Sequence, residues 1–110
     1  MIYWLGMLWL GIDTGTGGTR ALLIDRAGKE IAAVTAPHEA IRMEHPLWAE
    51  QRPEDWVEAA VHAIRGVLST SGATGRDIRG IGLSGQMHGL VILDRDGNVI
   101  RPSLIWCDQR

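Results

Sequence analysis

A glycine-rich turn between two apolar runs constrains the fold of this chain more than any other feature of its sequence. Within the stretch LGIDTGTGGTRALLID, the Gly15–Gly18 segment is typical of a tight turn. The flanking runs, Leu8–Thr14 and Thr19–Asp25, are therefore predicted to be two strands joined by that turn. A second turn around Gly28 leads into a third apolar run, Ile31–Ala36. Together these segments predict an antiparallel three-strand meander.

One amphipathic helix is predicted after an irregular segment. Pro53 stands at a favourable first helical position, and two carboxylates follow in the first turn, where they oppose the positive end of the helix dipole. Gly72 is the predicted end of the helix. Apolar residues recur at helical spacing and predict a buried stripe, which consists of Val57, Val61, Ile64 and Leu68 and is widened by Ala60 and Val67.

Three further apolar segments extend the predicted sheet. Ile78–Ser84 is interpreted as a buried strand, Gly85–Gly89 interrupts it, and Leu90–Asp94 and Val99–Trp106 follow as strands around a turn. Antiparallel strands, a crossover helix and a new strand predict a mixed α/β fold with the helix packed on the sheet. Because no closing element follows WCDQR, we expect unpaired sheet edges and exposed apolar surface.

The glycine turn carries the first candidate site. Its glycines allow main-chain N–H groups to converge without Cβ clashes, and such groups form a concavity suited to phosphate oxygens. Thr16 and Thr19 can add hydroxyl donors, and Asp13 stands beside the turn. Phosphates repel a carboxylate unless a cation lies between them, and Mg²⁺ prefers carboxylates, waters and phosphate oxygens. The turn therefore indicates a metal-mediated nucleotide site. The alternative is a plain hairpin in which Asp13 satisfies turn amides.

A second candidate site lies in the stretch SGQMHG and near the end of the chain. A sugar needs hydrogen-bonding groups at fixed positions and a flat apolar surface for its C–H face. Gln86 and His88 supply the polar groups, Met87 can pack against carbon, Trp106 offers a flat face, and Asp108 can accept hydroxyl protons. From the residues alone, a structural turn or core histidine is the favoured interpretation of His88.

Composition excludes several other classes of protein. The chain has 110 residues and a net charge of −2 without a Lys/Arg block, which argues against nucleic acid as a partner. A single cysteine excludes an internal disulfide framework and fits a reducing cytoplasm. The apolar start is too short to span a membrane and lacks the features of a signal peptide. We interpret residues 1–7 as an apolar extension, with Met7 as an alternative start.

The motifs together resemble a known family. The stretch GIDTGTGGTRALLID resembles the first phosphate loop of the actin-like ATPases, which have a ribonuclease H-like fold. HPLWAEQRPEDW and GLSGQMHGLVILDRDGNVIRPSLIWCDQR are similar to the N-terminal part of the FGGY carbohydrate kinases, and within them to the xylulokinase branch. The resemblance covers residues 8–110, which we expect to form an incomplete N-terminal domain of such a kinase.

The resemblance implies roles for particular residues. Phosphate contacts fall on Gly15, Thr16, Gly17, Gly18 and Arg20, and Asp13 is implied to hold Mg²⁺ through water. Met87 and His88 match the substrate-binding pair of the xylulokinases, with Gln86, Trp106 and, less directly, Asp108 beside them. Many relatives carry Ser or Thr where this chain has Gly17 and Gly18, so only main-chain contacts to phosphate are expected there. An exposed strand arginine is the alternative interpretation of Arg20.

The implied reaction is phosphoryl transfer from ATP to a ketose, with D-xylulose as the expected substrate and Mg²⁺ as the metal. In this family the catalytic base and the adenosine pocket lie further along the chain. We therefore expect residues 1–110 alone to be inactive and their partner to be the remainder of the kinase. The alternatives are a non-catalytic sugar-binding or interaction module, and an FGGY kinase for glycerol, gluconate, ribulose or autoinducer-2.

Overall fold

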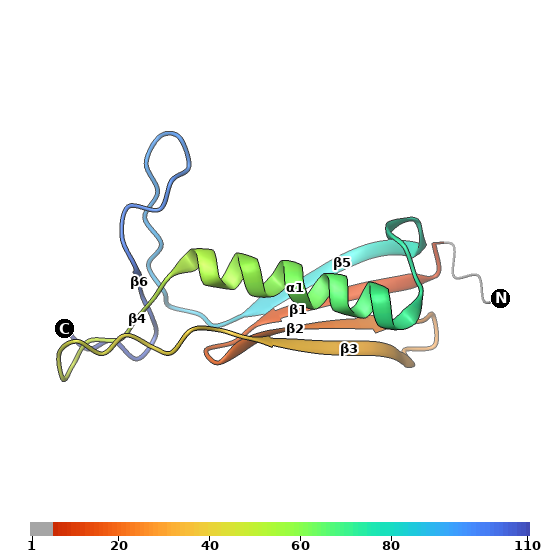
Figure 1. The fold of residues 1–110 in the computed structure, drawn as a ribbon, viewed down its shortest axis with the longest axis horizontal. Helices are drawn as coiled ribbons and strands as arrows, with labels where there is room; N and C mark the ends of the chain where they lie inside the picture. Colours follow the sequence, from red (N-terminus) through yellow and green to blue (C-terminus); the bar gives the residue numbers. More distant parts are fainter. Residues whose placement is uncertain (1–5) are drawn as a thin grey trace.

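A four-stranded sheet with one long helix on one face forms the body of the molecule (Figure 1). The computed structural model describes residues 6–110, so the predicted N-terminal extension lies outside the described residues except for Gly6 and Met7. The sheet has the order β3-β2-β1-β5. Its strands are β1 (Leu8–Thr14), β2 (Gly18–Ile24), β3 (Glu30–Pro37) and β5 (Ile78–Gly85).

The predicted meander and the mixed α/β class are confirmed. Strands β1 and β2 pair antiparallel, as do β2 and β3, whereas β5 runs parallel to β1 after the crossover through α1 (Pro53–Ser71). A short 3-10 turn, η1 (Gly75–Asp77), leads into β5.

The strand register places Asp13 in the middle of one end of the sheet. Asp13 lies opposite Arg20 on β2 and opposite Ser84 on β5. Successive side chains of a strand point to opposite faces. The face under α1 therefore holds Leu8, Leu10, Ala21 and Leu23, which are buried, and Asp13 belongs to the other face.

The helix begins and ends as predicted, but it buries a different face. Pro53 is its first residue, and Gly72 caps it in the left-handed conformation with an N–H bond to the Leu68 carbonyl. The buried residues are Pro53, Ala59, Ala63 and Val67, whereas 64% of the surface of Val57 is exposed, as is 40% of that of Val61. The predicted stripe is therefore wrong in its N-terminal half, while Ile64 and Leu68 do pack against the core.

Close packing of the helix on the sheet explains the difference. Ala59, Ala63 and Val67 are buried at a spacing of four residues, and the two alanines let the helix backbone approach the sheet closely. At Gly66, an added Cβ would lie 3.0 Å from both methyl groups of Val34 on β3. The larger Val57 and Val61 side chains are excluded from this narrow contact and lie on the flank of the helix.

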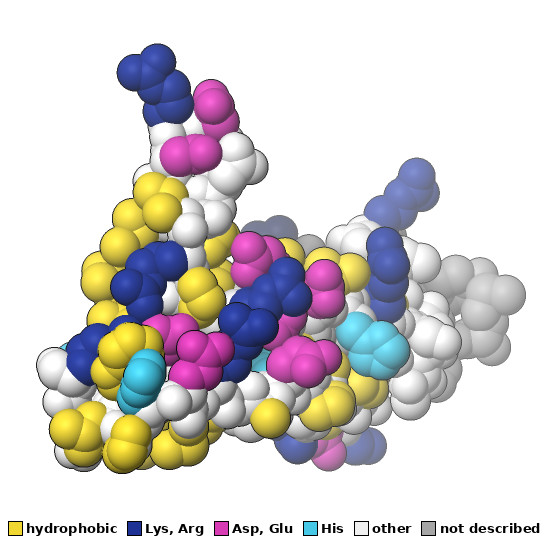
Figure 2. All heavy atoms as spheres, turned by 60° about the vertical axis from the view of Figure 1, so that its left-hand side comes forward, with side chains coloured by type: hydrophobic (Ala, Val, Ile, Leu, Met, Phe, Trp, Pro, Cys, Tyr) yellow, Lys and Arg dark blue, Asp and Glu magenta, His cyan; other side chains and the backbone are white. Residues whose placement is uncertain are grey.

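A second, smaller layer joins the middle of the chain to its end. Strands β4 (Glu50–Gln51) and β6 (Ser103–Leu104) pair antiparallel and form a separate two-stranded sheet. After β5 the chain projects away from the body as an arm, residues 90–104, which ends with β6 (Figure 1). Hydrophobic side chains gather along the arm below a charged tip (Figure 2).

The predicted strands Leu90–Asp94 and Val99–Trp106 are largely wrong. Only Ser103–Leu104 is a strand, and the rest of the arm is held by isolated bridges such as Leu93 to Val99. The two sides of the arm are joined by widely spaced main-chain bonds, including Ile100 N–H to the Ile92 carbonyl at 3.0 Å. A two-stranded ribbon is marginally stable unless a third strand pairs with it or a helix covers it, so the arm does not form a regular ladder of hydrogen bonds. Over residues 6–110, no helix is both long and apolar enough to cross a membrane.

Candidate functional site

The glycine turn closes the β1–β2 hairpin at one end of the sheet. The Gly15 N–H donates to the Gly18 carbonyl at 2.9 Å. A Cβ added at Gly18 would lie 2.7 Å from the Ala36 carbonyl oxygen on β3, whereas one added at Gly17 would meet nothing within 4 Å. Neither glycine has a positive φ. Gly18 is therefore required for close packing against β3, while Gly17 leaves the outside of the turn open to a ligand.

Asp13 and Arg20 lie beside this turn on the face of the sheet opposite α1. The Asp13 carboxylate makes no hydrogen bond or ion pair with any residue between 6 and 110, so the alternative in which it satisfies turn amides is wrong. Arg20 contacts Glu30 at 3.4 Å, with both side chains more than half exposed. A shallow hollow of about 270 Å³ is bordered by Asp13, Arg20 and Ser84.

The two threonines of the turn have different environments. Thr19 is fully buried, and its hydroxyl contacts Thr14 Oγ1 at 3.3 Å and His38 Nε2 at 2.7 Å. The expectation that Thr19 offers a hydroxyl to phosphate is therefore wrong, because its position in β2 points the side chain under α1. The Thr16 hydroxyl donates to Gln86 Oε1 at 3.2 Å and accepts from Trp106 Nε1 at 2.9 Å.

The predicted sugar-side residues follow the carboxyl end of β5, next to the glycine turn. The Gln86 N–H donates to the Thr14 carbonyl at 2.8 Å, which ties this segment to the end of β1. Met87 and His88 come next and are exposed. His88 has a φ of 64°, a conformation that is uncommon for a residue other than glycine and that clusters at functional sites.

Trp106 reaches the same place from the far end of the chain. Its indole N–H donates to Thr16, and more than half of its surface stays exposed. The structure thus brings Gln86 and Trp106 against the predicted phosphate turn, although 70 and 90 residues separate them from Thr16 in sequence.

Asp108 lies apart from this group in a partly buried ionic cluster. Its carboxylate accepts the Ala49 N–H at 2.8 Å and forms an ion pair with Arg110 at 2.7 Å. The hydrogen bonds from Arg110 hold the pKa of the Asp108 carboxyl far below its usual value. Arg110 also bonds Glu50 at 2.7 Å and lies 3.9 Å above the ring of Trp48. With its oxygens occupied in this way, the contact of Asp108 with a sugar stays a prediction.

Two residues at the site were missed by sequence reasoning. Gln51 donates from Nε2 to the Thr16 carbonyl at 2.7 Å, and its Oε1 accepts from Gln86 Nε2 at 2.9 Å. His38 donates its main-chain N–H to the Gly17 carbonyl at 3.0 Å. Gln51 belongs to the motif HPLWAEQRPEDW, so a position within a family motif was the available signal, whereas nothing in the sequence distinguishes His38.

The described residues fit a magnesium–nucleotide only as a partial site. Between residues 6 and 110 there is no group of three His, Cys, Asp or Glu side chains able to enclose a metal. A single carboxylate beside an open glycine turn is nevertheless the arrangement expected when phosphate oxygens and waters supply the other ligands of Mg²⁺. The cleft of about 470 Å³ beside Gln86 and His88 is lined mainly by apolar groups such as Val57 and Leu83, and it offers few partners for a polyol.

Comparison with known proteins identifies relatives over nearly the whole chain. Residues 8–110 match the family described as "FGGY family of carbohydrate kinases, N-terminal domain". The xylulose kinase of Bacillus subtilis is 41% identical over 101 residues, which are 92% of this chain and 20% of that protein. The chain therefore spans about a fifth of the length of the curated relative it matches.

Solved structures agree with this match. The crystal structure of a xylulose kinase from Brucella ovis superposes with a TM-score of 0.86 at 40% identity and covers 94% of this chain and 22% of that one. A glycerol kinase from Plasmodium falciparum, crystallised with ADP, superposes with a TM-score of 0.83 at 25% identity, covering 94% and 21%. The predicted ribonuclease H-like class is confirmed by these superpositions.

Proposed function

This chain belongs to the FGGY family of carbohydrate kinases, and we propose that it forms the first part of an ATP-dependent kinase for a ketose, with D-xylulose as the substrate. One observation carries the proposal: Thr16 of the glycine turn bonds both Gln86 and Trp106. The predicted phosphate and sugar sites are thus neighbours. Phosphoryl transfer requires the phosphate and the sugar to lie next to each other, because its catalysis consists mainly of positioning the reactants and stabilising charge.

Each side of the site has a distinct task in this proposal. The main chain around Gly17 receives phosphate oxygens, and Asp13 holds Mg²⁺ through water. The metal, when bound, neutralises charge on the phosphate oxygens. Arg20 adds positive charge on the same face of the sheet. Met87, His88 and Trp106 hold the sugar, His88 through a hydrogen bond and Trp106 through its exposed ring. The proposal also assigns the base that takes the hydroxyl proton and the adenosine pocket to parts of the kinase outside residues 8–110. It places the kinase in the cytoplasm.

A chimaeric kinase tests the proposal. Residues 8–110 replace the matching first fifth of the Bacillus subtilis xylulose kinase, and phosphorylation of D-xylulose is measured with ATP and Mg²⁺. We expect turnover, and we expect Asp13→Ala to lower kcat by about 100-fold, the order of magnitude for losing a charge-stabilising group. Arg26→Ala, a change in the exposed turn after β2, is the matched control and leaves kcat within twofold. Full turnover of the Asp13→Ala chimaera contradicts the assignment of the metal.

Glycerol is a second candidate substrate, since the superposition with a glycerol kinase is nearly as good as that with a xylulose kinase. The same chimaera, assayed with both compounds, discriminates between them. A larger kcat/KM for D-xylulose supports the proposal, and a larger value for glycerol replaces it.

A further inference from the structure

A closed ring of hydrogen bonds connects the two halves of the candidate site. The Thr16 hydroxyl donates to Gln86 Oε1 at 3.2 Å, Gln86 Nε2 donates to Gln51 Oε1 at 2.9 Å, and Gln51 Nε2 donates to the Thr16 carbonyl at 2.7 Å. All three bonds run in the same direction around the ring. Successive hydrogen bonds of this kind polarise one another, so the ring is stabilised as a unit.

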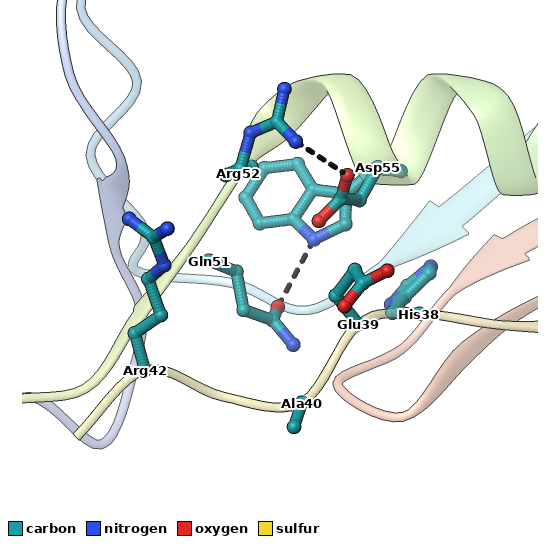
Figure 3. Close-up of a pocket in the computed structure, with 8 residues that line it drawn as sticks. His38, Glu39, Ala40, Arg42, Gln51, Arg52 and Asp55 are labelled. Atoms are coloured by element: carbon teal, nitrogen blue, oxygen red, sulfur yellow. Dashed lines mark hydrogen bonds and ion pairs between the residues drawn. The ribbon is translucent and has the colours of Figure 1, made fainter.

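Two tryptophans fix the direction of this ring. An indole N–H can only donate, and a main-chain carbonyl can only accept. Trp56 Nε1 donates to Gln51 Oε1 at 3.0 Å, so the Gln51 amide nitrogen must face the Thr16 carbonyl. Trp106 Nε1 donates to the Thr16 hydroxyl, so the hydroxyl proton is directed to Gln86. Figure 3 shows the Gln51 amide and its bond to the indole, with His38 nearby.

Gln51 is the only member of the ring that sequence analysis assigned to neither site, and it is well buried. Only 4% of its surface is exposed, and each of its amide atoms has a protein partner. It lies on β4, two residues before α1 begins at Pro53, and bonds Trp56 of that helix, so the helix and the second layer both hold it in place. A rigidly held amide that bonds the turn on one side and Gln86 on the other is able to transmit a shift between them.

We propose, on the basis of the proposed function, that Gln51 is a positioning residue that couples sugar binding to nucleotide binding. A sugar that engages Gln86 or the ring of Trp106 reorients partners of Thr16. Through Gln51 the ring passes this reorientation to the Thr16 carbonyl. The glycine turn that contains this carbonyl is the one whose main chain receives phosphate in the proposed function. Linkage requires the reverse effect to be equal, so bound nucleotide raises sugar affinity by the same factor.

The test measures this coupling in the chimaera directly. The dissociation constant of ADP with Mg²⁺ is measured by calorimetry without D-xylulose and at a saturating concentration of it. We expect D-xylulose to tighten ADP binding by about fivefold or more, within the usual range of coupling between sites. In Gln51→Glu we expect this factor to fall below twofold and kcat to drop about 10- to 100-fold. Glutamate keeps the size and both acceptor bonds but turns a second acceptor toward the Thr16 carbonyl.

Matched variants separate positioning from simple loss of structure. Trp56→Phe removes one bond to Gln51, but the Thr16 carbonyl still accepts from the Gln51 amide nitrogen and keeps its orientation. The ring stays closed, so the coupling factor and kcat stay within twofold. Thr16→Val opens the ring at Gln86 and keeps the main-chain bond to Gln51, so it abolishes the coupling factor, whereas Thr16→Ser restores it. The coupling factor is the ratio of the two ADP dissociation constants, without and with D-xylulose, measured in the same variant. A direct effect of the Thr16 substitution on phosphate binding changes both constants equally and cancels in the ratio.

Defined outcomes overturn the inference. Coupling retained in Gln51→Glu or Thr16→Val overturns it, as does an unmutated chimaera that turns over D-xylulose but binds ADP equally well with and without the sugar. Equal loss of kcat and melting temperature in Gln51→Glu and Trp56→Phe shows a structural role only and also overturns it. An unmutated chimaera without turnover on any sugar refutes the proposed function itself and the inference with it.

Discussion

Single residues of the site combine backbone constraints with chemistry, and His88 is an example. Its φ of 64° places an L side chain in a left-handed conformation, between the exposed Met87 and Gly89. Histidine tolerates this conformation better than most residues, but glycine adopts it at no steric cost. A strained backbone that presents a polar ring beside the glycine turn is consistent with selection for binding rather than for stability.

Replacing His88 is therefore expected to separate stability from sugar binding. We predict that His88→Gly raises the free energy of unfolding of the 110-residue chain by about 0.5–1 kcal/mol relative to His88→Ala. Both variants raise the KM of the chimaera for D-xylulose more than its KM for ATP. Urea denaturation and steady-state kinetics measure the two effects. A glycine variant no more stable than the alanine variant contradicts the argument from strain.

The two glycines at the end of the turn provide a matched pair. We predict that Gly18→Ala destabilises the chain by about 1–3 kcal/mol, because the added Cβ would lie 2.7 Å from the Ala36 carbonyl oxygen. Gly17→Ala meets nothing within 4 Å and is expected to be neutral or slightly stabilising. Thermal unfolding of both variants checks this, and equal melting temperatures are the result that would disprove it.

Much of the residue-level site follows from the sequence, and the failures have a physical reason. The pattern predicted the turn and the magnesium role of Asp13, and the resemblance predicted the sugar-binding role of His88; both roles stay predictions. The sequence did not predict that Thr19 is buried, because the face that a strand residue occupies depends on the register of the sheet. Nor did it predict the ring through Gln51, since hydrogen bonds between residues 35 or 70 positions apart depend on tertiary structure.

The closeness of packing decides which residues of an element are buried, and α1 shows that helical periodicity alone does not predict them. A helical spacing shows which positions share a face, but not how wide the contact with the sheet is. The predicted stripe favoured Val57 and Val61 because they are larger and more apolar than alanine. The observed contact is so close that Ala59, Ala63 and Gly66 occupy it instead.

The contact between Gly66 and Val34 makes a prediction about this interface. Alanine is favoured over glycine inside a helix by about 1 kcal/mol. In this chain Gly66→Ala is expected to destabilise, because the new methyl would lie 3.0 Å from two carbons of Val34. In a Val34→Ala background the same change should become stabilising. A double-mutant cycle by urea denaturation measures the coupling, and additive effects would contradict this account of the interface.

The ionic cluster that anchors the end of the chain to β4 predicts a pH dependence. The pKa of Asp108 is held below its usual value by Arg110, so the folded state favours the ionised carboxylate. Its contribution to stability is complete above the unfolded-state pKa of about 4 and is lost as pH falls below it. We expect the melting temperature to fall more steeply between pH 4 and pH 3 in the unmodified chain than in Asp108→Asn. Parallel slopes would exclude this role.

At the scale of the whole molecule, the chain is elongated. Its radius of gyration is 16.3 Å, whereas a compact domain of this length has about 13 Å. The arm accounts for part of this extent (Figure 1). Apolar side chains stay exposed along the arm (Figure 2), and Ile81 and Leu83 on the helix side of β5 are exposed as well. The expectation of exposed apolar surface is thus confirmed for the described residues.

Leu83 on β5 tests what that surface contributes. With 81% of its surface exposed, Leu83 gains little from folding, so Leu83→Thr is expected to change the free energy of unfolding by less than about 0.5 kcal/mol. Leu10→Thr, the buried counterpart on β1, should cost several times more. Sedimentation velocity should show less self-association for Leu83→Thr. A stability loss equal to that of Leu10→Thr would contradict the exposure.

The bond between Trp106 and Thr16 has a consequence for biosynthesis. The hairpin that carries the glycine turn is synthesised before two of its partners, which follow Thr16 by 70 and 90 residues. Local pairing can form the hairpin early, but contacts at such separation must wait for the rest of the chain. The contacts of the glycine turn in the nascent protein therefore stay incomplete until the indole of Trp106 has been synthesised.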